Sequence, residues 1–293
     1  MKSLKYKQLL VIFFFFCFTI TNAQQVEFNG ILYELEYHYY YDGPKVAVTG
    51  ISDEKIEEVE IPETISYKNK SYVVEVIGEG AFKDNLNIKS VSLSDNITYI
   101  IDNAFKGCTN LESVTFGNNV KIIYSGAFDG CSNLKDVTFP GSLEFIGTAA
   151  FQNCTGLTDI VIHNNIRALG TAVFFGCKGV KEYTIGKGIE EIKMATFGGT
   201  PTAIYMLNET PIPCEEYAFL SYSATLYVPI GCKAAFEAAS PWNNFKIVEM
   251  DFTSIENSKK ETNDNIYYNL KGHRVEYPKN GIYIVNGKKV IKK

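Results

Sequence analysis

The sequence has very little of what catalytic and metal sites are built from. Its three histidines, His38, His163 and His273, fall in different parts of the chain, so none is expected to complete a Ser-His-Asp or Cys-His site. No Cys-x-x-Cys, His-Glu-x-x-His, Gly-x-Ser-x-Gly or phosphate-binding glycine loop occurs. Any two of the 33 acidic residues could still converge for glycosidase chemistry. We expect no catalytic residue, metal or cofactor, and a carboxylate-based hydrolase is only a third hypothesis.

Basic residues are also in short supply. The chain has 28 Lys and Arg against 33 Asp and Glu, which gives a formal net charge of −5. Nucleic-acid binding depends on clustered basic residues that neutralise phosphates, so nucleic acid is an unlikely class of partner. Hydrophobic residues make up 46% of the chain, which is enough for a sizeable core and argues against disorder.

No apolar run in the sequence is long enough to cross a membrane. The run from Leu9 to Ile20 has about a dozen residues, whereas a spanning helix needs roughly 20. It follows a stub with three lysines and ends in short residues before Ala23, which is the pattern of a secretory signal peptide. We predict cleavage after Ala23, so that residues 1–23 are lost. The mature protein is then exported, to the medium or the cell surface, without a membrane span.

What the sequence does have is a repeat of constant period. Phenylalanines and cysteines recur in step every 23 residues over about six copies. A fixed period of about 20 to 29 residues is typical of leucine-rich repeats, whose units stack because none can bury its apolar face alone. The phenylalanines are Phe82, Phe105, Phe128, Phe151, Phe174 and Phe197, with Phe219 one residue early, and the cysteines are Cys108, Cys131, Cys154 and Cys177.

Each unit predicts a short strand, a return segment and a tight turn. Apolar and polar residues alternate from Leu111 to Phe116, as expected for a strand with one buried face, and the pattern recurs at 134–139, 157–162 and 180–185. Two apolar residues three apart, such as Val120 and Ile123, then return the chain across the solenoid. A Gly or Asn two residues after each Ala-Phe, such as Gly107, tolerates positive φ and predicts the turn.

The complete unit reads Leu-x-x-Val-x-Phe, a turn, then Ile-x-x-Ile-Gly-x-x-Ala-Phe-x-Gly-Cys. It resembles the BspA-like leucine-rich repeats of bacterial surface proteins, over residues 56–250. The resemblance implies a binding or adhesion protein and leaves its ligand open. Val173 and Thr196 depart from the alanine of the motif, and the strand pattern at 203–207 is weak. These departures predict an irregular solenoid after Gly199.

The mature chain keeps six cysteines, and an even number in an exported protein normally indicates disulfides. Cysteines one coil apart, however, lie in a single column about 5 Å apart, with side chains that point in parallel rather than at each other. We therefore predict that the four repeat cysteines are buried free thiols. Cys214 and Cys232 remain as the pair available for a bridge.

Segments on either side of the repeats have different compositions. Residues 24–55 are rich in aromatic and β-branched residues around Asp42-Gly43, a hairpin turn pair, and predict a β cap over the first coil. The polar composition of residues 251–265 predicts a linker. Residues 266–293 predict two or three short strands and resemble the C-terminal tails of exported Bacteroidetes proteins, some of which are sorting signals. The expected fold class is α+β to mainly β: a leucine-rich-repeat solenoid with an N-terminal β cap and a small C-terminal β tail.

The candidate ligand-binding residues are those that alternate with the buried residues of the strands and point outward in columns. Strand faces of solenoids commonly bind ligands, although a merely solvated sheet face would show similar residues. The tyrosines at 37 and 39–41 of the cap are a second option. One column is Ser92, Thr115, Thr138, Val161 and Thr184; the other, which turns acidic along the solenoid, is Ser90, Ser113, Asp136, Asp159 and Glu182.

These observations favour a secreted or cell-surface leucine-rich-repeat adhesion protein. Its expected partner is an extracellular protein or glycan of a host or neighbouring cell. The alternative is an accessory structural protein of the envelope, docked through its C-terminal tail.

Overall fold

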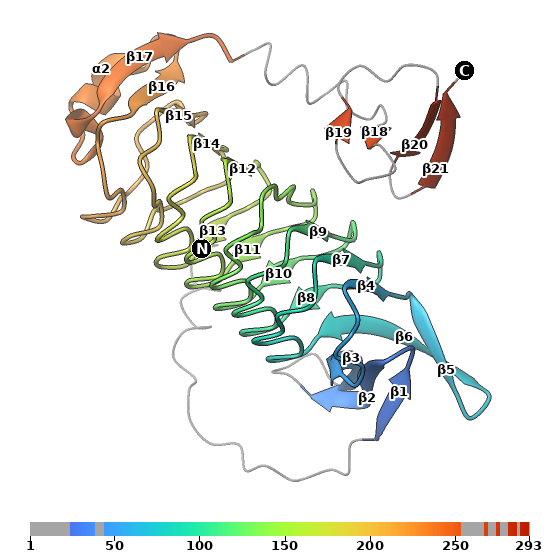
Figure 1. Ribbon diagram of the computed structural model, residues 1–293. Helices are drawn as coiled ribbons and strands as arrows, with labels where there is room; N and C mark the ends of the chain where they lie inside the picture. The colour runs from blue at the N-terminus through green and yellow to red at the C-terminus, as the bar shows by residue number, and fades with distance from the viewer. Residues whose placement is uncertain are drawn as a thin grey trace, which may run out of the picture.

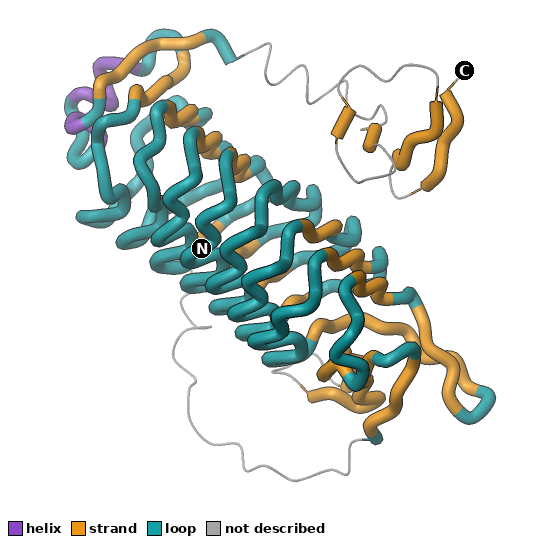
Figure 2. The backbone as a smooth tube through the Cα atoms, in the orientation of Figure 1, coloured by secondary structure: helices purple, strands orange, loops and turns teal. Residues whose placement is uncertain are grey.

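The computed structural model describes residues 24–38 and 44–252, together with four short strands between 267 and 292. The predicted signal peptide, the Asp42-Gly43 turn and most of the predicted linker lie outside the described residues. The chain is a mainly β solenoid of about eight turns (Figures 1 and 2). Helix in the described part is limited to α2 (Lys233–Glu237) and the 3-10 turn η1 (Trp242–Asn244). None of the helices described is long and apolar enough to cross a membrane.

One side of the solenoid, which we call the strand face, is a ladder of parallel strands in two sheets. The first sheet contains β4 (Glu58–Ile61), β7 (Ser90–Leu93) and β9 (Ser113–Thr115). The second sheet contains β12 (Asp159–Ile162), β14 (Glu182–Ile185), β15 (Ala203–Met206), β16 (Thr225–Pro229) and β17 (Lys246–Met250).

Between the two sheets, the strand that the pattern predicts at 134–139 does not form. A single bridge pairs Asp136 with Ser113, and Pro140, which has no N–H to donate to a ladder, follows directly. The weak segment at 203–207, in contrast, forms the full strand β15, in register with β14 over four residues. The strand ladder therefore continues past Gly199, where an irregular solenoid was expected. The paired return strands, in contrast, end at Ala168–Leu169, and Tyr205 follows Thr184 after 21 residues instead of 23.

The opposite side of the solenoid carries the return segments. The strands β8 (Tyr99–Ile100), β10 (Ile122–Ile123), β11 (Phe145–Ile146) and β13 (Ala168–Leu169) pair in parallel, two residues per coil. They continue through β6 (Lys70–Ile77) into the N-terminal strands β3 (Pro44–Ile51), β2 (Ile31–His38) and β1 (Gln25–Phe28). The strand β5 (Thr64–Tyr67) forms a hairpin with β6. The N-terminal strands thus extend the return sheet (Figure 1).

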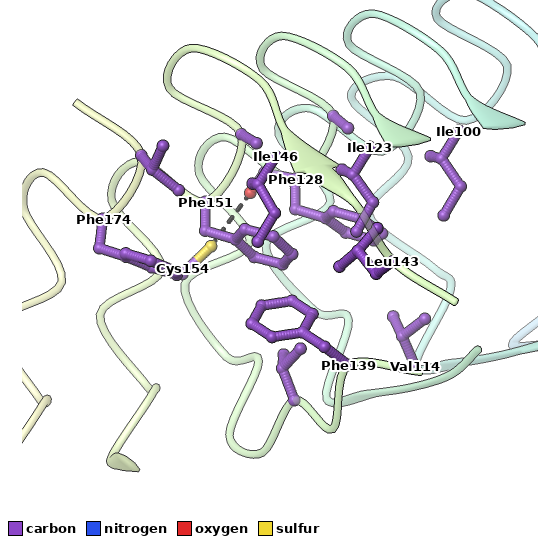
Figure 3. Close-up of a cluster of buried hydrophobic side chains, with 14 of the residues drawn as sticks. Ile100, Val114, Ile123, Phe128, Phe139, Leu143, Ile146, Phe151, Cys154 and Phe174 are labelled. Atoms are coloured by element: carbon purple, nitrogen blue, oxygen red, sulfur yellow. Dashed lines mark hydrogen bonds between the residues drawn. The ribbon is translucent and has the colours of Figure 1, made fainter. Parts of the chain in front are cut away.

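The interior is a stack of similar layers. The rings of Phe82, Phe105, Phe128 and Phe151 are buried and stacked, with successive centroids 5.0 Å apart, and the spacing widens to 5.8 Å between Phe151 and Phe174 and to 6.4 Å between Phe174 and Phe197. Figure 3 shows Phe128, Phe151 and Phe174 of this stack. The predicted stacking of one phenylalanine per coil is confirmed. Aromatic rings in this arrangement add direct attraction to the burial of apolar area.

The repeat cysteines form a second buried column beside the rings. Each thiol donates to the carbonyl of the phenylalanine in the preceding coil; Cys154 Sγ, for example, lies 3.1 Å from the oxygen of Phe128. Burial raises the pKa of Cys108 and of Cys177 to about 12. The four are free thiols, as predicted, and Cys214 and Cys232 are free as well.

The turns after each Ala-Phe have positive φ, as predicted. Gly107 has φ of 75° and Asn153 has φ of 57°. A Cβ atom on Gly107 would overlap the Asp84 carboxylate of the preceding coil. This turn therefore requires glycine for its φ and for close packing between coils.

The last coils close the solenoid around Trp242, whose indole N–H donates to the Ile212 carbonyl at 3.0 Å. The Trp242 ring lies 5.7 Å from the rings of both Phe219 and Phe236. Beyond residue 252, four strands form an antiparallel sheet in the order β19-β18-β20-β21, where two or three were expected. Their bounds are β18 (Tyr267–Tyr268), β19 (Arg274–Val275), β20 (Gly281–Val285) and β21 (Lys288–Lys292).

Candidate functional site

The strand face lines up the predicted columns from coil to coil. Ser90 pairs with Ser113 and Ser92 with Thr115 in the first sheet. Asp159 pairs with Glu182 and Val161 with Thr184 in the second. The side chains of both columns are exposed, except Ser90 and Thr184, which are half-buried. Asp136 joins its column through the bridge to Ser113, and Thr138 lies in the coil without a strand.

Two ion pairs join neighbouring coils beside the first half of this face. Lys89 Nζ lies 2.7 Å from a Glu57 carboxylate oxygen, and Lys135 Nζ lies 3.0 Å from one of Glu112. All four side chains are at least half exposed, so solvent screens both pairs and they add little to stability. The exposed Glu58 and Glu60 on β4, which pair with Ser90 and Ser92, form no ion pair among the described residues.

Charges on the second half are not balanced. Asp136, Asp159 and Glu182 are exposed, and no ion pair joins any of them to another residue within 24–38 or 44–252. Neighbouring strands in a sheet are about 4.8 Å apart, so Asp159 and Glu182 lie close together on paired positions. This part of the face is an acidic row available to a cationic ligand.

Two tyrosines that the sequence patterns did not single out follow on the same face. Tyr205 on β15 pairs with Thr184 and with Tyr227 on β16, so the three continue one column. The two rings are stacked, with centroids 5.1 Å apart and planes 14° from parallel. Burial raises the pKa of the Tyr205 hydroxyl, as do the nearby Glu182, Tyr227 and Asp159.

The period explains why these tyrosines were missed. Tyr205 comes 21 residues after Thr184 rather than 23, so a column extended by constant spacing falls outside the strand. Phe219, which comes one residue early, signals a change of period in the sequence but does not give the two-residue shift at Tyr205.

The cap tyrosines show no binding site in the described residues. Tyr37 is half-buried against Ala47, Val76 and Ile101, and its hydroxyl accepts the backbone N–H of Glu79 at 3.1 Å. Tyr37 therefore contributes to the packing of the N-terminal strands. The tyrosines at 39–41 lie outside the described residues, and so does His273.

Features typical of small-molecule or metal sites lie elsewhere or do not occur in the described residues. No group of three or more His, Cys, Asp or Glu side chains there is placed to hold a metal ion. Two open hollows of about 600 and 490 Å³ lie at the N-terminal end, the first lined by Ser52–Lys55, Glu57 and Asn87 and the second by residues of β2, β3 and β6. Neither contains a residue of the columns.

Residues 75–204 match the family described as BspA type leucine rich repeat region, in six copies. The match covers the predicted site residues at 90–184 and ends immediately before Tyr205. A search of curated proteins gives no match.

Two solved structures share the fold. One is a leucine-rich-repeat protein of T. pallidum, with 23% identity and a TM-score of 0.53; the match covers 62% of this chain and 86% of that protein. The other is a leucine rich cell surface protein of Faecalibacterium prausnitzii, with 21% identity and a TM-score of 0.56; the match covers 89% of this chain and 60% of that protein. At these identities the similarity establishes the solenoid fold.

Proposed function

We propose that this chain is an exported, non-catalytic protein of the cell surface or medium that binds a protein or glycan of a host or neighbouring cell through its strand face. The observation that carries the proposal is the contrast on each strand. The buried positions repeat from coil to coil, whereas the outward positions vary, from Glu58 and Glu60 through Ser and Thr to Asp, Glu and Tyr. Side chains that packing leaves free to vary are those that recognise a partner.

Other features support the surface location. Residues 1–23 have the composition of a signal peptide, and the structurally similar protein of Faecalibacterium prausnitzii is a cell surface protein. Export requires that the mature chain begin at Gln24. The intact mass of the protein recovered from the envelope and medium tests this, and a mass that includes residues 1–23 would contradict it.

The binding experiment uses the mature chain, residues 24–293, against immobilised extracellular-matrix proteins and a panel of glycans. A ligand found this way is then measured with a Thr115→Arg, Thr138→Arg double variant, which places bulk on the strand face. Ser125→Arg is the matched control, since Ser125 is exposed but lies outside that face. We expect at least tenfold weaker binding for the double variant and no change for the control. Equal binding by both variants would place the ligand elsewhere.

A second candidate function follows from the charge of the tail. Residues 266–293 contain seven Lys and Arg and one acidic residue, whereas the chain as a whole is acidic. A basic segment of this kind suits docking to an anionic component of the envelope, which would make the protein an accessory structural part. Truncation after Phe252, which keeps that buried side chain, should then lower the envelope-associated fraction without lowering the melting temperature.

A further inference from the structure

The stacked tyrosines leave one ring face open. Tyr205 and Tyr227 stack along the direction from strand to strand, so each ring turns its second face toward the next position of the column. For Tyr205 that position is Thr184, whose short side chain reaches only the base of a phenol ring. The outer part of the Tyr205 ring face is therefore uncovered above Thr184.

Two carboxylates lie beside this open ring face. Glu182 is two residues before Thr184 on the same side of β14, and Asp159 is its paired neighbour on β12. Both lie near enough to the Tyr205 hydroxyl to act on its ionisation. Neither has an ion-pair partner among the residues that the structure describes. An aromatic face and unbalanced negative charge thus meet at one position.

A guanidinium group matches both features. It is flat, permanently cationic, stacks on aromatic rings and binds carboxylates through two parallel hydrogen bonds. A lysine ammonium would satisfy the charge without filling the flat space against the ring. A neutral sugar would stack on the ring and leave the carboxylates unbalanced. The spacing of about 4.8 Å between strands leaves room for one flat group over Thr184.

We propose that the position over Thr184, bounded by Tyr205 and by the carboxylates of Glu182 and Asp159, is a subsite for an arginine side chain of a basic protein segment. Val161 continues the column on the far side of Thr184 and is 42% exposed, which gives apolar contact for the arginine methylenes. The inference rests on the proposed function, because it names the ligand chemistry of the same strand face.

The test uses fluorescence anisotropy of the mature full chain with a labelled peptide of alternating Gly and Arg. Peptides with Lys or Glu in place of Arg, and a neutral glycan panel, are measured beside it. We expect the Arg peptide to bind, the Lys peptide to bind several-fold more weakly and the Glu peptide not to bind. Affinity should fall as salt concentration rises, because the charges are exposed.

Single variants test the contributions of the Tyr205 ring and the Glu182 charge separately. Tyr205→Thr, the residue that three earlier coils carry in this column, should weaken Arg-peptide binding about fivefold or more, and Tyr205→Phe should retain it. Glu182→Gln should weaken binding about three- to tenfold and reduce its salt dependence. The matched controls are Tyr217→Asn, which removes a tyrosine that is 63% exposed at another edge, and Glu144→Gln, an exposed acid outside the strand face.

The outcomes distinguish this proposal from the proposed function. Failure of the Arg peptide to bind, equal binding of the Arg and Lys peptides, or equal losses in the controls would overturn the arginine subsite. Binding of a neutral glycan that Tyr205→Thr abolishes, with no binding of the Arg peptide, would also overturn it and would leave the strand face as a glycan site. The proposed function fails separately, if no ligand of the broader panel depends on Thr115 and Thr138.

Discussion

The interior of the solenoid and its strand face are built from the same coils but follow opposite rules. Inside, Phe105, Phe128 and Phe151 stack at the same 5.0 Å, and each repeat cysteine makes the same hydrogen bond. Outside, one column passes from Thr115 through Val161 to Tyr205. A buried side chain packed between two coils can be replaced only if the side chains of those coils change too, whereas an exposed side chain can be replaced alone. Conformity from coil to coil thus marks the core of this protein, and variation marks the strand face that we propose as its binding surface.

The largest difference between the two regions should appear in thiol reactivity. Burial raises the pKa of Cys108 and Cys177 to about 12 from 9.0, so in the folded protein their thiolate fraction at pH 8 falls about a thousandfold. Titration with an Ellman-type reagent should find the four repeat cysteines unreactive in the native, unreduced protein. All six cysteines of the mature chain should react in denaturant. Fewer than four free thiols after denaturation would show that some repeat cysteines are paired.

The next largest effect is expected from the aromatic stack. Phe128→Ala removes a ring held between two others and should lower the free energy of unfolding by about 3 to 5 kcal/mol. Phe175→Ala is the matched control, because Phe175 is 40% exposed and should cost less than about 1 kcal/mol. Chemical denaturation of both variants gives the comparison. Similar losses would mean that the interior is not the rigid region proposed here.

A smaller loss is expected at the turns. Gly107→Ala places a side chain at positive φ and against Asp84, which should cost about 1 to 2 kcal/mol. Gly141→Ala should be neutral or slightly stabilising, since a Cβ atom there meets nothing within 4 Å. Melting curves of the two variants, measured together, test the assignment. A larger loss of stability for Gly141→Ala than for Gly107→Ala would contradict the close packing between coils at the Gly107 turn.

The smallest change in stability should come from the strand face. Tyr205→Thr removes one stacked ring from a half-buried pair on the surface and should lower the free energy of unfolding by less than about 1 kcal/mol. Differential scanning calorimetry should show a melting temperature close to that of the unaltered protein. A loss as large as that of Phe128→Ala would make Tyr205 a structural residue, and the distinction between core and face would not hold there.

Local sequence patterns were sufficient for the features that each coil determines by itself. The 23-residue period and the alternation around Val114 predicted the stack, the thiol column and the outward columns. They failed where one coil departs from its neighbours. The strand predicted at 134–139 does not form and leaves a single bridge at Asp136, and the two-residue shortening before Tyr205 displaces the column from the constant spacing. The parallel pairing of β3 with β6 also had no sequence signal, because it joins segments that do not share the repeat. The acidic row was visible in the sequence, but its lack of partners depends on packing across coils.

The direction of the hydrogen bonds has a mechanical consequence. From coil to coil, backbone N–H groups donate along the length of the solenoid, as from Phe105 to the Ala127 carbonyl at 2.7 Å. Tension applied between the two ends therefore breaks the hydrogen bonds of one coil interface at a time. Each coil that peels away releases 23 residues, or roughly 75 to 83 Å of extended chain. A protein held at both ends would therefore lengthen in steps of about one coil, down to the closing coil, where Trp242 packs on Phe219.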